Sequence, residues 1–123
     1  MVGKVGRETA TYHGSSGTYY GFTVFSSAET LPRAAGIFAL ATRAVGPEQW
    51  RIILIGKTSN FSAQLSTRNS SAITEARRRG ATHILLHFSA IATARRREAA
   101  HNLWRRIRSP LVAWDNEEIR RRA

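Results

Sequence analysis

The sequence predicts an α+β fold in which a small antiparallel or mixed β-sheet is flanked by helices. Three runs of aromatic, β-branched or aliphatic residues come first, at positions 18–25, 36–43 and 50–56. Helical patterns with clear ends then alternate with one more apolar run. Strands that gather early and helices that pack onto them are typical of α+β domains. A length of 123 residues suits one compact domain.

The first part of the chain predicts a flexible arm followed by three strands. Residues 1–17 are rich in Gly, Ser and Thr, so we expect an arm or loop. The aromatic and β-branched run 18–25 predicts a strand. Residues 36–43 suit a strand or a helix by propensity, and the Gly46-Pro47 turn that follows favours a strand. The apolar run 50–56 then predicts a buried second strand of a hairpin.

The second part predicts helices around one more strand. A short helix is expected near residues 61–65. Residues 70–80 begin with Ser, end with three arginines and stop at a glycine, an order that suits the helix dipole and a glycine cap. Residues 82–88 predict a strand, and residues 92–107 predict the longest helix, with Pro110 just past its end.

The domain organisation follows from these elements. We expect a single domain over residues 18–112, preceded by the arm and followed by a charged tail at 113–123 that is either a short helix or frayed.

The chain has no Cys, which excludes a disulfide framework and thiolate metal ligands. Neither a signal-peptide core nor a run of ~18 apolar residues is present, so we expect a cytoplasmic protein and no membrane partner.

The charge is strongly positive and unevenly distributed. Lys and Arg number 19 against 8 acidic residues, a formal charge of +11, and residues 62–123 carry +8 of it. GC-rich coding would explain Arg over Lys, but not the scarcity of acids. A generic solvated surface, an acidic protein or a membrane are alternatives. Because such an excess attracts polyanions at long range, we expect nucleic acid, DNA first, as the partner.

Two tripeptides at neighbouring strands carry a family resemblance. They are Gly36-Ile37-Phe38 and, after a turn, Leu54-Ile55-Gly56, followed by Lys57-Thr58-Ser59-Asn60-Phe61. Later, Gly80-Ala81-Thr82-His83 precedes a hydrophobic strand, and an Arg-rich helix ends before Pro110-Leu111. In order and spacing, residues 22–111 resemble the GIY-YIG nuclease superfamily. Gly36 and Gly56 also have a physical interpretation, because glycine permits close backbone approach at a strand.

The resemblance implies a phosphodiesterase centre with four groups on one sheet face. These are two Tyr, one Arg, and one Glu that holds a divalent metal ion. The corresponding positions hold Phe38, Leu54, Gln64 and Ala100. Phe38 keeps the ring without the hydroxyl, Leu54 loses both, and Gln64 carries no charge. The Asn that often closes the family pattern corresponds to Val112. We therefore expect a degenerate site that does not cleave.

The sequence leaves two other functions open. One is an active endonuclease that uses Mg²⁺ or Mn²⁺, with Glu98 in its site and His87 or Lys57 as an unconventional base. However, Glu98 lies some 160° around the helix from Ala100, so we expect it to be solvated. His83 and His87 would lie ~13 Å apart along a strand, too far to share one zinc ion, so no metal site or cofactor is predicted. The other function is a protein–protein adaptor that uses the aromatic strand at 19–25 as an exposed edge.

Clusters of basic residues are the predicted contacts with nucleic acid. Three arginines end one helix, and others begin and end the next, where Arg97, Arg105 and Arg108 share one stripe. Such a stripe tracks phosphates rather than reading bases. The full predicted set is Lys57, Arg68, Arg77, Arg78, Arg79, Arg95, Arg97, Arg105, Arg106 and Arg108.

Overall fold

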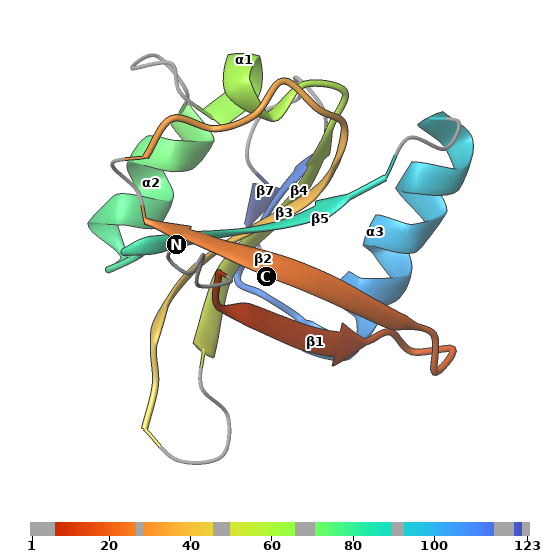
Figure 1. Ribbon diagram of the computed structural model, residues 1–123. Coiled ribbons are helices and arrows are strands. Elements are labelled where there is room, and N and C mark those ends of the chain that lie inside the picture. The colour runs from red at the N-terminus through yellow and green to blue at the C-terminus, as the bar shows by residue number, and fades with distance from the viewer. Residues whose placement is uncertain are drawn as a thin grey trace.

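The computed structural model describes residues 7–26, 29–45, 50–65, 71–89, 93–114 and 120–121 (Figure 1). These residues form one mixed, seven-stranded sheet and three helices, so the predicted α+β class is confirmed. The sheet order is β1-β2-β5-β3-β4-β6-β7. The strands are β1 Thr9–His13, β2 Tyr19–Ser26, β3 Gly36–Arg43, β4 Trp50–Thr58, β5 His83–Phe88, β6 Leu111–Trp114 and β7 Arg120–Arg121.

The centre of the sheet is β3, which pairs antiparallel with β4 on one side and with β5 on the other. One register shift interrupts the β3–β4 ladder between Leu40 and Ala41. The parallel pair is β4 with β6, in which Leu54 lies opposite Leu111. Since parallel neighbours need a long crossover connection, the chain passes through all three helices and β5 before it returns beside β4.

The helices lie on opposite sides of this sheet. Figure 1 shows α1 (Phe61–Leu65) and α2 (Ser71–Arg78) over one face and α3 (Thr93–Ile107) over the other. The helix α2 ends in a Schellman motif, in which Gly80 N–H donates to the Arg77 carbonyl and Ala81 N–H to the Ala76 carbonyl. Gly80 has a φ of 102°, which confirms it as the predicted stop.

Each face of the sheet has its own hydrophobic core. Under α1 and α2, the sheet contributes Phe38, Leu40 and Leu54, which pack against Phe61 and Ile73 of the helices. The second core lies under α3, where the members are Ile37, Ala39, Ile55, Leu85, Ala100 and Leu103. Strand alternation explains the division, because neighbouring residues of a strand point to opposite faces.

Three expectations from the sequence are wrong at the ends of the chain. The predicted arm contains β1, which pairs with β2 from Thr9↔Thr23 to His13↔Tyr19. As a result β2 lies between β1 and β5 and is not an exposed edge, which removes the basis of the adaptor hypothesis. In the tail, residues 113–114 complete β6 and Arg120–Arg121 forms β7, so these described residues are strands and not a helix or a frayed segment, while the other tail residues lie outside the described ranges.

Gly36 is required by the packing of the sheet. A Cβ at this position would lie 1.9 Å from the His87 carbonyl oxygen and 2.7 Å from Cζ of Phe61. Both distances are far below van der Waals contact, so the expected close backbone approach is confirmed at Gly36. Gly56 is buried and lies opposite Phe38 in the β3–β4 ladder.

Candidate nucleic-acid interface

The four positions that correspond to the nuclease residues do not meet on one surface. Phe38 and Leu54 are fully buried in the core beneath α1 and α2. Gln64 lies on α1 on that same side, and its Oε1 is 3.4 Å from Oγ1 of Thr58. Ala100 is fully buried in the core on the opposite face, under α3. The expectation of one shared face is therefore wrong for Ala100, because α3 covers the other side of the sheet.

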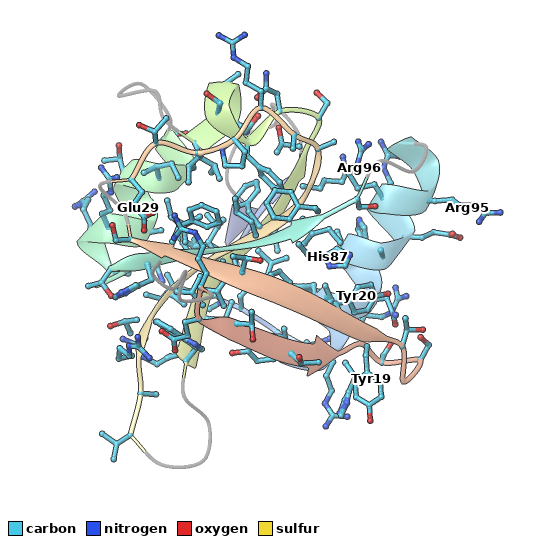
Figure 2. The ribbon with its side chains drawn as sticks, in the orientation of Figure 1. Tyr19, Tyr20, Glu29, His87, Arg95 and Arg96 are labelled. Carbon is cyan, nitrogen blue, oxygen red and sulfur yellow. The ribbon has the colours of Figure 1, made fainter. Side chains whose placement is uncertain are left out.

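The residues proposed for the alternative endonuclease, Glu98, His87 and Lys57, are also dispersed. Glu98 is exposed on α3, as expected from its helical position. His87 lies on the α3 side of β5, half-buried, with its ring 5.4 Å from that of Tyr20 and 5.7 Å from that of Phe22 (Figure 2). Its Nδ1 donates to the Gly21 carbonyl at 3.0 Å. Among the residues that the structure describes, no group of His, Asp and Glu could hold a metal ion.

Lys57 cannot serve as a surface contact or as a base for a bound substrate in this conformation. It is fully buried, because β4 extends to Thr58 and places Lys57 within the ladder, opposite Ile37 and Trp114. Arg96 is also buried, on the face of α3 that carries Ala100. Arg68 lies outside the described residues.

The arginines at the end of α2 are partly neutralised. Glu75, one turn earlier, lies 3.4 Å from Nη1 of Arg78 and 3.0 Å from Nε of Arg79. Arg77 and Arg78 are exposed and Arg79 is half-buried. Since α2 and α3 cover opposite faces of the sheet (Figure 1), the predicted arginine clusters do not form one continuous surface.

Two arginines in the first half of the chain, Arg7 and Arg43, are likewise paired with acids. Nη2 of Arg43 binds Oε1 of Glu8 at 2.6 Å, and the guanidinium stacks 4.2 Å from the ring centroid of Trp50. Arg7 forms an ion pair with Glu29 and stacks over Phe25. Hydrogen bonds from Arg7, and then from the Ser26 amide, lower the pKa of Glu29 to about 2. The hydrogen bond from Arg43 lowers the pKa of Glu8.

The arginines of α3 differ, because none of the exposed ones forms an ion pair within the described part of the chain. Arg105 Nε makes only a long contact with Ser15 Oγ, at 3.5 Å. Arg108 follows the helix with a φ of 58° and lies 4.9 Å over the Trp104 ring. Their guanidinium donors are therefore available to an anion. The exposed members are Arg95, Arg97, Arg105, Arg106 and Arg108.

The β1–β2 turn, residues 14–18, is docked onto α3 by one buried amide. Asn102 Oδ1 accepts hydrogen bonds from Ser15 Oγ at 2.8 Å and from the Ser16 amide at 3.0 Å. Its Nδ2 donates to Ser16 Oγ and to Tyr20 Oη, both at 2.9 Å. A Cβ at Gly14 would lie 2.5 Å from Nδ2 of Asn102, so glycine is needed there. The turn is thus held in place, although its composition predicts a flexible segment.

Two open grooves flank this docked turn. The smaller, of about 480 Å³, is lined by Ser16, Arg95, Glu98, Asn102 and Arg105, among others. The larger groove, of about 950 Å³, follows the outer edge of β1. Its second wall consists of the start of β4 and the end of α3, and the lining includes His13, Tyr19, Trp50, Arg51, Arg106 and Ile107.

Tyr19 is the most exposed aromatic side chain among the described residues, with 74% of its surface accessible. Its ring lies 5.4 Å from that of His13, its cross-strand neighbour. Sequence reasoning gave Tyr19 a role only as part of the adaptor's strand at 19–25, and it gave none to His13 or Asn102. For Asn102 the sequence did contain a signal. This residue lies beside Leu103 on a helix that packs onto the sheet, which predicts a buried amide that needs hydrogen-bond partners.

Comparison with known proteins gave no relative: no family model, curated protein or solved structure matches the chain. Among the described residues, no helix combines the length and the apolarity that a membrane crossing requires.

Proposed function

We propose that this chain is a DNA-binding protein on a GIY-YIG-like scaffold and that it does not cleave its ligand. The observation that carries the proposal is the set of exposed, unpaired arginines on α3. A guanidinium binds phosphate through charge-assisted hydrogen bonds. Glu98 is the one acid on the helix itself, and no acid among the described residues forms an ion pair with these exposed arginines, so that part of the chain does not neutralise them.

The spacing of these arginines suits a phosphate backbone. From Arg95 to Arg106 the helix rises about 16 Å, at 1.5 Å per residue. That length corresponds to about five nucleotide steps of a B-form strand. Contacts of this kind position a nucleic acid without reading its sequence.

The replaced nuclease positions support the absence of cleavage. Hydrolysis of a phosphodiester needs a group that takes a proton and a charge that stabilises the transition state. Phe38 and Leu54 carry neither and are inaccessible to a substrate. Ala100 carries neither and lies on the other face of the sheet.

The test is a DNA titration at rising salt, followed by fluorescence anisotropy, on two matched triple variants. Arg97/Arg105/Arg106→Gln removes three charges from α3, and Arg77/Arg78/Arg79→Gln removes three from α2. We expect the α3 variant to weaken binding at least ~10-fold and to reduce the salt slope by about 2 to 3, because fewer counterions are released. The α2 variant should bind like the wild type.

Three outcomes would contradict the proposal. They are no binding to DNA at all, an affinity that does not change with salt, and equal losses in the two variants. A parallel incubation with supercoiled plasmid and Mg²⁺ or Mn²⁺ tests cleavage. If the wild type nicks the plasmid and Glu98→Ala does not, the protein is an endonuclease and the non-cleaving assignment is wrong.

A further inference from the structure

The groove along β1 combines an exposed aromatic ring with unpaired cations. Tyr19 and His13 lie at one end of it, and Arg51 and Arg106 line it as well. Both arginines are exposed, and neither is ion-paired within the described residues. The described lining contains no acidic residue. The groove is therefore complementary to a ligand that carries both a flat ring and negative charge.

Strand alternation explains why Tyr19 is presented to solvent. Tyr12 and Tyr20, which are opposite each other in the β1–β2 ladder, pack on the α3 side. Their neighbours His13 and Tyr19 point to the other side of this hairpin, where Thr11 and Gly21 are also exposed. Gly21 has nothing within 4 Å of its Cβ position, so the surface next to Tyr19 is open to a flat ligand.

The chain on both sides of Tyr19 is also held in position. Asn102 binds both the turn before Tyr19, through Ser16, and the residue after it, through Tyr20 Oη. Gly14 N–H donates to the Thr18 carbonyl at 2.9 Å and closes the turn. A turn that is already closed and anchored loses less conformational entropy when a ligand binds beside it, which favours binding.

We propose that this groove binds an unpaired stretch of DNA, with one base stacked on Tyr19 and neighbouring phosphates bound by Arg106 and Arg51. The inference rests on the proposed function and adds the form of the ligand. Aromatic rings beside a positively charged groove are the features by which proteins hold single strands. In a duplex, each base is already stacked between its neighbours, so Tyr19 would have no ring face to contact.

An extended peptide is the competing occupant, because β1 is an edge strand whose outer side is unpaired in the described sheet. Such a peptide would use the backbone of β1 and would not need the ring of Tyr19 or the guanidinium groups. The arginines that share the groove favour DNA, and the variants below separate the two occupants.

The experiment measures the affinity of the full chain for fluorescein-labelled dT12 and for the dT12·dA12 duplex by anisotropy. We expect tighter binding of dT12. Tyr19→Ala should weaken dT12 binding about 5- to 150-fold, the typical loss for one base–aromatic stack, and leave the duplex affinity unchanged. Tyr19→Phe should bind like the wild type, because the stacking surface remains.

A matched control is Phe88→Ala, which removes another exposed aromatic side chain from a neighbouring strand, outside the described lining of this groove. It should not change dT12 binding. A dT12 strand with 2-aminopurine in place of one base gives a second readout, since stacking on Tyr19 should quench its fluorescence in the wild type but not in Tyr19→Ala.

Failure of this inference differs from failure of the proposed function. If DNA binds and the α3 arginines matter, but Tyr19→Ala binds dT12 as the wild type does, the base site is wrong and the function stands. Equal or tighter binding of the duplex would also overturn the base site alone, as would tighter binding of the matched U12 RNA. If neither DNA binds, the proposed function itself is wrong.

Discussion

The two faces of the sheet are packed differently. Beneath α1 and α2, the strands contribute Phe38, Leu40, Leu54 and Leu86, and Thr58 at the end of β4 is the buried polar residue that contacts α1. Beneath α3, the core also encloses Lys57, Arg96 and Asn102. The first face is where the resemblance would place the two nuclease tyrosines. The second face supports a helix whose outer side carries unpaired arginines.

This difference indicates which side of the molecule presents charged groups to a ligand. Phe38 and Leu54 belong to a closed apolar cluster beneath α1 and α2, which stabilises the fold and offers no polar group to a ligand. On the other face, the buried Asn102 amide must keep its partners in the β1–β2 turn and at Tyr20, because an unsatisfied buried amide is costly. It therefore holds that turn against α3.

The largest effect is expected at Gly36, where the first face meets the backbone of β5. Gly36→Ala would force a Cβ against the His87 carbonyl, and we expect a loss of at least ~3 kcal/mol in the free energy of unfolding, because neither backbone can yield easily. Urea denaturation measures it. The control is Gly21→Ala on β2, which has open space at its Cβ and should be neutral or slightly stabilising. Equal stability of the two variants would contradict the packing described here.

The second effect concerns the docked turn on the other face. Asn102→Ala removes the partners of Tyr20 Oη and of the Ser16 amide, and we expect a loss of about 2 kcal/mol. Hydrogen exchange should also show the Ser16 amide losing protection. The matched control is Asn60→Ala, which removes a more exposed helix cap that binds the Ala63 amide at 3.3 Å, with an expected cost of ~1 kcal/mol or less.

A smaller effect, on DNA affinity, is expected from two single variants that each remove one acid, one on α3 and one on α2. Glu98→Gln removes a carboxylate from the groove that Arg95 and Arg105 line, and should strengthen DNA binding about 2- to 3-fold, the size of one exposed charge interaction. Glu75→Gln changes the net charge equally but acts at α2. If both variants gain the same affinity at equal salt, overall charge rather than the α3 surface controls binding.

The smallest expected effect is a pH dependence of stability, which arises from the Arg7–Glu29 ion pair on the side of the sheet that holds Phe25. The pKa of Glu29 is about 2, below its ordinary value of 4.5, so its ion pair with Arg7 stabilises the folded state. That contribution is complete above pH ~4.5 and is lost as the pH falls towards 2. The melting temperatures of the wild type and Glu29→Gln should therefore differ at pH 6 and converge near pH 2. A constant difference would refute the assignment.

The sequence predicted those elements whose signals are local. The bounds of β3 and α1 agree with the prediction, and the end of α2 was correct because Gly80 has no Cβ to oppose a positive φ. Periodicity also identified the buried side of α3, on which Ala100 and Leu103 lie. These features depend on residues within a few positions of each other.

The features that were missed depend on distant partners. The strands β1, β6 and β7 are short and exist through pairing, which propensity does not reveal. Periodicity shows which side of α3 is buried, but not which face of the sheet it covers, so Ala100 was assigned to the wrong surface. Lys57 was misplaced because β4 continues two residues beyond its apolar run, and the alternation of the ladder turns that side chain inward.

The parallel strand β6 has a consequence for assembly of the chain. Its ladder joins Leu54 to Leu111, so it forms only after the intervening helices and β5 have brought these residues together, and contacts of such long range form slowly. Until then, the aliphatic edge of β4 offers unpaired amides and carbonyls to any other chain. A protein shortened before Leu111 would retain that open edge and would aggregate through it.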